Sequence, residues 1–189
     1  SSDLKKNLFS EDLRHINTKS DSEILLNIFA HELHLHSKES FTPDDVFYAV
    51  AGVHRRVQGA YAVVALISDR GIVAFRDPMG IRPLCFGTRT VDGKTETMIA
   101  SESVALDSAG FKLDRDIKPG EAIFIDINGE IHTRLCTKDT GHSPCIFEFV
   151  YFARPDTIID GISVYSARMK MGKSLAKKIT NEWKDHDID

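Results

Sequence analysis

The hydrophobic pattern of this 189-residue chain changes its period near Gly59. Before Gly59, apolar residues recur at the three- and four-residue spacing of an amphipathic helix. After Gly59, short apolar runs of strand length alternate with clusters of turn residues. Helices followed by several antiparallel strands predict an α+β layered domain.

Two helices are predicted before the change of period. The first spans about Asp21 to His36, because Ser20 and Glu23 fit a capping box ahead of apolar residues at helical spacing. The second begins with Thr42 as N-cap and Pro43 at the first helical position. Its expected buried face consists of Val46, Phe47, Val50 and Val53.

The apolar run at residues 60–67 predicts a strand that is buried on both faces. Residues 72–75 and 84–86 are expected to pair as a hairpin across the tract Arg76–Leu84, which reads RDPMGIRPL. Within this tract, Asp77 to Gly80 predict a turn, with an aspartate that bonds its own backbone and a glycine in the left-handed region.

Further elements follow downstream of the tract. A strand is expected at 97–100, a short helix at 103–109, and a hairpin over 121–135 whose Asn128-Gly129 favours a type I′ turn. After the apolar and aromatic run 146–153, residues 165–183 predict a basic amphipathic helix. Its candidate buried positions are Met169, Met171, Leu175, Ile179 and Trp183.

The composition predicts a soluble globular protein in a reducing compartment, the cytoplasm. The chain is 42% hydrophobic and 28% charged, and its net charge of −4 gives no support for a nucleic-acid partner. No apolar run approaches the roughly 20 residues that span a membrane, and the N-terminus lacks a signal peptide. Three cysteines at wide spacing argue against a disulfide framework. Both ends look cut, so we expect a fragment of a longer protein.

Several candidate chemical groups have a simpler structural interpretation. His31 and His34 could share a helix face, but no third ligand is evident and no metal is predicted. Ser1 lacks the buried strand that an N-terminal nucleophile needs. Asp21, in the first turn of a helix, is stabilised by the helix dipole whether or not it binds a ligand. Arg76 and Asp77 could either fix their loop as an ion pair or line a pocket.

Three motifs together resemble the class II glutamine amidotransferases. They are the Arg76–Leu84 tract, Ala100–Leu106 (ASESVAL) and Lys118–Glu121 (KPGE), in the order of that class. A narrower resemblance is to the amidophosphoribosyltransferase family, on Arg14–Glu23, Phe147–Asp156 and Gly161–Arg168. The resemblance covers essentially the whole chain and implies an αββα sandwich of the N-terminal-nucleophile hydrolase type.

The resemblance also implies a domain layout. Residues 1–140 would be the C-terminal part of a class II glutaminase domain, 141–164 a connector, and 165–189 the first helix of a truncated α/β phosphoribosyltransferase domain. The catalytic cysteine would precede Ser1, so the fragment alone is expected to be inactive. The complete enzyme would hydrolyse glutamine and transfer the ammonia to phosphoribosyl pyrophosphate, giving phosphoribosylamine, pyrophosphate and glutamate in purine biosynthesis.

The resemblance implies that Asp21 binds the α-ammonium group of glutamine and that Tyr151 lines an ammonia channel. Cys145 matches one ligand of an iron–sulfur cluster in some members, but four thiolates are needed and Cys85 and Cys136 match no cluster motif. Mg²⁺ is expected in the missing phosphoribosyltransferase domain, together with purine nucleotide inhibitors and a homo-oligomeric assembly. The alternatives are another class II amidotransferase, such as glucosamine-phosphate synthase, or a non-catalytic binding or assembly module. The sugar-aminating branch is disfavoured by the tract Tyr151–Asp156.

Overall fold

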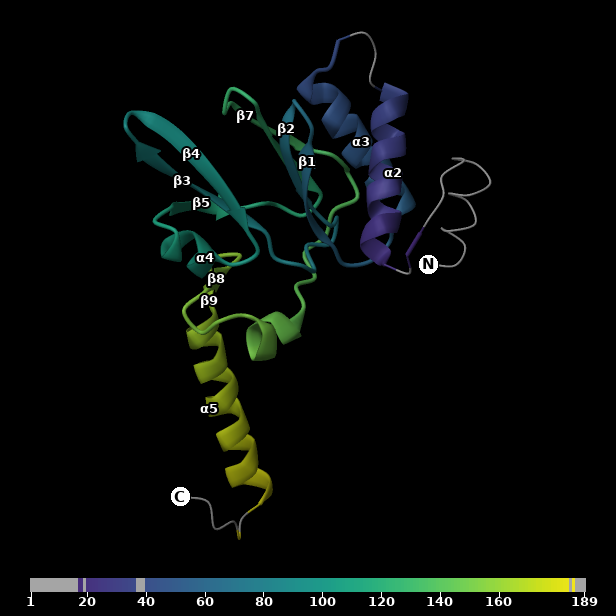
Figure 1. Ribbon diagram of the computed structural model, residues 1–189. Coiled ribbons are helices and arrows are strands. Elements are labelled where there is room, and N and C mark those ends of the chain that lie inside the picture. Colours follow the sequence, from purple (N-terminus) through teal and green to yellow (C-terminus); the bar gives the residue numbers. More distant parts are fainter. Residues whose placement is uncertain (1–16, 19, 37–39, 184, 186–189) are drawn as a thin grey trace. The chain divides into compact units, whose positions relative to one another are not determined.

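The computed structural model describes residues 17–18, 20–36, 40–183 and 185 (Figure 1). The expectations on Ser1 and on residues 14–16 lie outside this part. The described residues fall into two compact units, which are treated separately below. The described residues of Ser1–Arg82 and Ile117–Ser143 form the first unit, and those of Pro83–Asp116 and Pro144–Asp189 form the second. This division follows packing, and the domain boundaries at 140 and 164 stay a prediction.

The first unit is an antiparallel sheet with two helices on one face (Figure 1). The strand order is β1 (Ala62–Ile67), β2 (Gly71–Arg76), β6 (Glu121–Asp126), β7 (Ile131–Leu135). The helices α2 (Asp21–His36) and α3 (Pro43–Arg56) lie side by side. Their apolar faces and the sheet form the core, which includes Ile24, Ile28, Phe29, Val46, Phe47, Val50, Val53, Val73, Phe75 and Phe124.

Both predicted helices are confirmed, with their starts where the capping residues placed them. The Thr42 amide donates to the Asp45 carboxylate at 2.7 Å, and Pro43 occupies the first turn of α3. At the start of α2, the Ser20 hydroxyl accepts from the Ser22 amide at 3.3 Å. Side chains that satisfy the free backbone amides therefore fix where each helix begins.

The prediction that residues 60–67 form a strand buried on both faces is wrong. The strand is present as β1, but its residues alternate in burial, and Val64 and Leu66 are 54% and 78% exposed. The reason is that the core covers one face of β1: Val63, Ala65 and Ile67 pack against it, whereas Val64 and Leu66 lie on the opposite face of the strand. An unbroken apolar sequence does not show how many faces of a strand are covered.

The predicted hairpin across Arg76–Leu84 is also wrong. Its first strand, β2, pairs with β1 and β6, whereas the second, β3 (Cys85–Val91), belongs to a sheet in the other unit. The tract is therefore a crossover between sheets. The turn inside it is confirmed, since the Gly80 amide donates to the Asp77 carbonyl at 3.0 Å and Gly80 has a φ of 61°.

Arg76 and Asp77 hold this crossover through backbone hydrogen bonds. The Asp77 carboxylate accepts from the amides of Met79, Ile81 and Arg82, each at 3.0 Å. The Arg76 guanidinium donates to three carbonyls, those of Gly80, Arg82 and Ile117. Both side chains are fully or almost fully buried, so they serve the scaffold of the first unit.

The hairpin over 121–135 is confirmed as β6 and β7, but its turn differs from the predicted type I′. Gly129 has a φ of 82°, whereas Asn128 is absent from the described residues with positive φ. The Asp126 carboxylate accepts from the amides of Asn128 and Glu130, at 2.8 and 3.0 Å. A three-residue loop with one left-handed glycine therefore replaces the two-residue turn.

The second unit contains a sheet of order β4 (Lys94–Ala100), β3, β5 (Lys112–Asp116), with the short helix α4 (Ser103–Ser108). The predicted strand at 97–100 and helix at 103–109 are confirmed, and β5 was not predicted. The π-helical turn η1 (Glu148–Phe152), the small ladder of β8 (Ile158–Ile159) and β9 (Ile162–Ser163), and α5 (Val164–Glu182) follow. The overall α+β class is as predicted.

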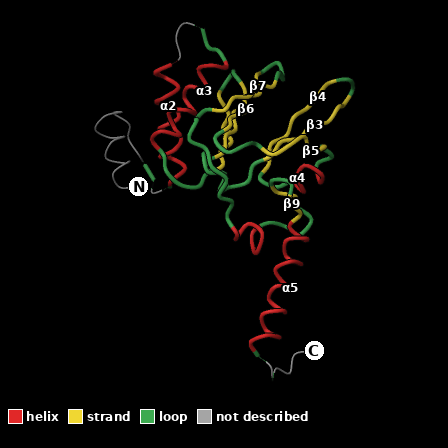
Figure 2. Tube along the Cα trace, turned by 180° about the vertical axis from the view of Figure 1, so that it is seen from behind, coloured by secondary structure: helices red, strands yellow, loops and turns green. Residues whose placement is uncertain are grey.

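The expected burial along the last helix is mostly wrong. Met171 packs against the small cluster around η1, but Met169, Leu175 and Trp183 are exposed, the last by 61%. The contacts of α5 are with η1 and β9 near its start, and the helix extends away from them in both views (Figures 1 and 2). Among the described helices, none is both long and apolar enough to cross a bilayer.

Candidate functional site

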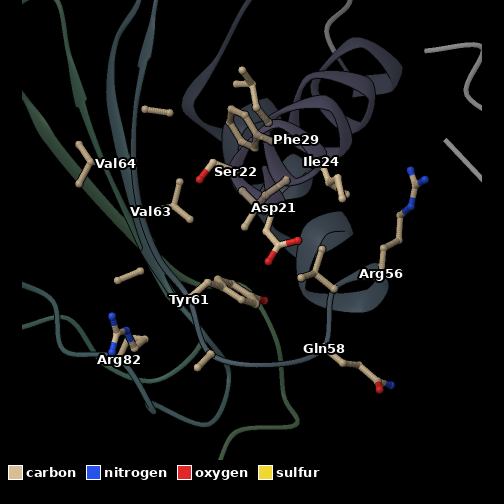
Figure 3. A pocket seen from close by; sticks show the side chains of 16 residues that line it. Asp21, Ser22, Ile24, Phe29, Arg56, Gln58, Tyr61, Val63, Val64 and Arg82 are labelled. Atoms are coloured by element: carbon tan, nitrogen blue, oxygen red, sulfur yellow. The ribbon is translucent and has the colours of Figure 1, made fainter. Parts of the chain in front are cut away.

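The first unit contains a cavity of about 890 Å³ between the start of α2, the end of α3 and β1 (Figure 3). Apolar walls come from Ile24, Phe29 and the strand residue Val63. Charged residues reach it from three separate segments, namely Asp21, Arg56 and Arg82. An apolar cavity with a few convergent polar groups is the usual form of a small-molecule site.

Asp21 is the acidic group of this cavity. It is the first residue of α2, and its carboxylate points into the cavity toward the ring of Tyr61 (Figure 3). The chain that enters α2 is held by Glu23, whose carboxylate accepts from the amides of Asn17 and Thr18 at 2.8 and 2.7 Å. Asp21 is thus anchored on a capped helix end, where the helix dipole stabilises a negative charge.

Arg56 and Arg82 also line this cavity, and the Arg56 guanidinium points away from Asp21 (Figure 3). Arg56 lies 3.2 Å from the carboxylate of Glu32, a buried residue of α2 that also contacts Arg55 at 3.5 Å. Arg82 follows the crossover turn, and its backbone amide is fixed by Asp77. The carboxylate of Asp21 and the guanidinium of Arg82 belong to residues that line one cavity, and such a pair of charges can accommodate the two charged ends of an amino acid.

Tyr61 forms part of the cavity wall and contacts His54 on its other side. The Tyr61 hydroxyl and His54 Nδ1 are 2.8 Å apart, and the two rings are stacked with centroids 5.9 Å apart. Burial lowers the pKa of His54 to about 4, and burial raises the pKa of Tyr61 above its ordinary value. Both groups are therefore uncharged at neutral pH.

Of the residues singled out from the sequence, Asp21 is the one that lines the cavity. Tyr151 and Cys145 belong to the second unit, where Tyr151 lies on η1 with its side chain 77% exposed and Cys145 is half-buried just before η1. Their predicted roles are not tested by this geometry and stay predictions.

The cysteines of the described residues are mostly shielded. Cys85 is buried and its thiol donates to the Ala100 carbonyl, and burial raises the pKa of Cys136 to about 12. Among described residues, the one group of three potential metal ligands is Asp126, Glu130 and His132. There the Asp126 carboxylate holds the β6–β7 turn through the amides of Asn128 and Glu130.

Sequence reasoning missed Tyr61, Arg56 and Arg82 as parts of the site. They come from a strand, a helix end and a crossover, and only folding brings them beside Asp21. Tyr61 carried one weak signal, because its hydroxyl is the only polar side-chain group in the apolar run 60–67. A buried tyrosine usually needs a hydrogen-bond partner.

Comparison with known proteins agrees with the sequence motifs. Residues 1–108 match the family model of the glutamine amidotransferase domain. The amidophosphoribosyltransferase of Pseudomonas aeruginosa is 58% identical over 98% of this chain and 37% of that protein. Its counterpart from Escherichia coli is 56% identical over 99% of this chain and 37% of that protein. The chain thus spans little more than a third of the length of these relatives.

Solved structures show the same relationship. The glutamine phosphoribosylpyrophosphate amidotransferase of B. subtilis, complexed with ADP and GMP, matches all of this chain with a TM-score of 0.74 and 29% identity, over 36% of that protein. This match confirms the predicted fold class, a partial sandwich of the N-terminal-nucleophile type. Because the family match covers residues 1–108, more than half of the chain, the chain belongs to the glutamine amidotransferase domain family.

Proposed function

We propose that the protein containing this chain hydrolyses glutamine and transfers the ammonia to phosphoribosyl pyrophosphate. The products would be phosphoribosylamine, pyrophosphate and glutamate. The observation that carries this proposal is the 58% identity to an amidophosphoribosyltransferase along nearly the whole chain. The charged cavity of the first unit supports it, because glutamine is an amino acid with one positive and one negative end.

In this proposal Asp21 binds the α-ammonium group of glutamine. A carboxylate there supplies a charge-assisted hydrogen bond and discriminates an amino acid from a simple amide. Asp21 itself is exposed, and the apolar side chains of Ile24 and Phe29 line the cavity beside it. Arg82 supplies positive charge at the same cavity for the α-carboxylate end.

The nucleophile is expected outside this chain, as a cysteine upstream of Ser1. Its thiolate would attack the glutamine amide carbon through a tetrahedral oxyanion, releasing ammonia and leaving a glutamyl thioester that water hydrolyses. The described residues contribute binding and orientation to this reaction. Holding the substrate in a near-attack position is a large part of rate enhancement in such reactions.

The test uses the full-length protein with the replacement Asp21→Asn. This variant should raise the KM for glutamine by at least tenfold, the loss expected for a charge-assisted hydrogen bond, while synthesis driven by added ammonium salt is unchanged. Asp44→Asn is the matched control, because Asp44 is also a first-turn aspartate but pairs with Arg134 outside the cavity. Unchanged glutamine kinetics in the Asp21 variant would refute its proposed role.

The acceptor is tested separately. Glutamine and phosphoribosyl pyrophosphate should yield pyrophosphate, and turnover with fructose 6-phosphate instead would assign the protein to the sugar-aminating branch. A gene that begins near Ser1, without an upstream cysteine, would favour the binding or assembly module.

Further parts of the proposal concern the rest of the enzyme. Tyr151 would line an ammonia channel, Mg²⁺ would be bound by the phosphoribosyltransferase part, and purine nucleotides would inhibit a cytoplasmic homo-oligomer. For an iron–sulfur cluster at Cys145, the chain's three cysteines are too few, since a cluster held by cysteine alone takes four thiolates. Such a cluster would need thiolates from elsewhere in the protein, and no step of the reaction is assigned to it.

A further inference from the structure

We propose that the hydrogen bond between Tyr61 and His54 makes Tyr61 a positioning residue for the amino-acid substrate of the Asp21 cavity. This inference rests on the proposed use of glutamine. It assigns a role to two residues that none of the sequence motifs includes, and it concerns how the wall facing Asp21 is held.

Tyr61 is tied in place from several directions. Its hydroxyl meets His54 Nδ1 at 2.8 Å, and its carbonyl accepts from the Asp77 amide at 2.9 Å, where the crossover turn begins. The ring also makes an edge contact with Phe75, with centroids 6.2 Å apart. With 8% exposure, Tyr61 is buried, yet it lines the cavity toward which the Asp21 carboxylate points (Figure 3).

The partner of this hydrogen bond lies behind the wall. His54 contributes to a separate, smaller cavity of about 440 Å³, together with Thr137 and Asp139, and does not line the Asp21 cavity. Among the described residues, His54 Nε2 has no partner that meets hydrogen-bond geometry, although the Gly120 carbonyl acts to raise the His54 pKa. The direct hydrogen bond from His54 to the wall of the Asp21 cavity is therefore the one to Tyr61.

An uncharged pair is the appropriate chemistry for this position. A neutral imidazole with its proton on Nε2 leaves Nδ1 as an acceptor for the Tyr61 hydroxyl. A charged imidazolium behind the wall would repel the substrate ammonium that Asp21 is proposed to bind. The neutral hydrogen bond between His54 and Tyr61 instead holds the Tyr61 ring in place without adding charge. Asp21 can then bind the substrate ammonium, and the Tyr61 ring fixes the position of the cavity wall that faces Asp21.

The experiment measures glutamine hydrolysis and ammonium-driven synthesis in the full-length protein. Tyr61→Phe keeps the ring and removes the hydroxyl, and His54→Leu removes the acceptor. Each should raise the KM for glutamine about fivefold, as expected for losing one neutral hydrogen bond, with ammonium-driven turnover unchanged. His54→Asn keeps a hydrogen-bonding atom near the Nδ1 position and should stay within about twofold of the wild type. The double variant Tyr61→Phe, His54→Leu should resemble either single variant, because the two residues share one bond.

The matched control is Tyr48→Phe, since Tyr48 is an exposed tyrosine of α3 that contacts His36 on the surface. A KM unchanged in Tyr61→Phe, or effects that add in the double variant, would overturn the inference. Equal losses of glutamine- and ammonium-driven turnover would show a purely structural pair and would also overturn it. A wild-type protein that hydrolyses no glutamine would refute the proposed function itself, and the inference with it.

Discussion

The Glu102 carboxylate accepts a hydrogen bond from the Thr157 hydroxyl at 2.7 Å, across 55 residues of sequence. The same oxygen accepts from the Arg154 amide at 2.8 Å, and the neighbouring Ser103 hydroxyl accepts from the Ile158 amide at 3.0 Å. Two motifs that carried the resemblance, residues 100–106 and 147–156, are thereby joined within the second unit. Glu102 holds the chain segment that leads from η1 toward α5.

Removing this contact should loosen the segment. Thr157 is fully buried, so Thr157→Val keeps the side-chain shape and leaves Glu102 without one donor, at a cost of about 1–2 kcal/mol. Hydrogen exchange of the amides of Arg154 and of residues 156–158 should become faster in the full-length variant. Thr180→Val is the control, because the Thr180 hydroxyl donates to the Ala176 carbonyl within α5. Unchanged hydrogen exchange in the Thr157 variant would contradict the role proposed for the Glu102–Thr157 hydrogen bond.

Gly52 is expected to tolerate no side chain. A Cβ at this position of α3 would lie 2.1 Å from the Glu32 carboxylate, which is buried and paired with Arg56. Gly52→Ala should therefore lower the free energy of unfolding by about 1–3 kcal/mol, because the helices must separate or Glu32 must leave its partners. Denaturant unfolding measures this effect.

Gly172→Ala in α5 is the opposite case. Nothing lies within 4 Å of the added Cβ, so helix propensity alone acts and the change should stabilise by up to about 1 kcal/mol. Equal effects of the two replacements would contradict the packing described for Gly52.

The stability of the first unit should fall as the pH drops from about 6.5 to 4. Burial lowers the His54 pKa from 6.5 to about 4, so in this window the unfolded chain binds a proton that the folded chain does not. By linkage, stability rises with pH across the window and is lost on acidification, by up to about 3 kcal/mol.

The measurement is thermal or denaturant unfolding at a series of pH values, compared between the wild type and His54→Asn. The free energy of unfolding of the wild type, minus that of His54→Asn, should decrease toward pH 4. The carboxylates contribute equally to both proteins and therefore cancel in this difference. His36→Asn serves as the surface control, and a constant difference for His54→Asn would show that this histidine does not titrate as described.

The sequence was sufficient to predict helices and hairpins whose ends are determined by their own capping and turn residues. Thr42 with Pro43, and Ser20 ahead of an amphipathic run, located both helices of the first unit, and Asn128-Gly129 located a hairpin. The turn type was missed because the Asp126 side chain captures the loop amides. Such a side-chain effect is not visible in a two-residue turn motif.

Long-range pairing could not be predicted in the same way. Strand β5 reads Lys-Leu-Asp-Arg-Asp, which has almost no strand propensity and exists because β3 supplies its partner. The two strands beside Arg76–Leu84 were assigned to each other because they are adjacent in sequence. The site shows the same limit: Asp21 could be named from a motif, whereas Tyr61 and Arg82 depend on tertiary structure.

The edge position of β1 has a practical consequence for handling this polypeptide. Within the part of the chain that the structure describes, β1 has a strand partner on one side only, and its residues Val64 and Leu66 have exposed side chains. An open strand edge beside apolar side chains invites pairing between molecules and aggregation. Expression of these residues as a separate polypeptide should therefore favour insoluble material, and longer boundaries are the better starting point for purification and crystallisation.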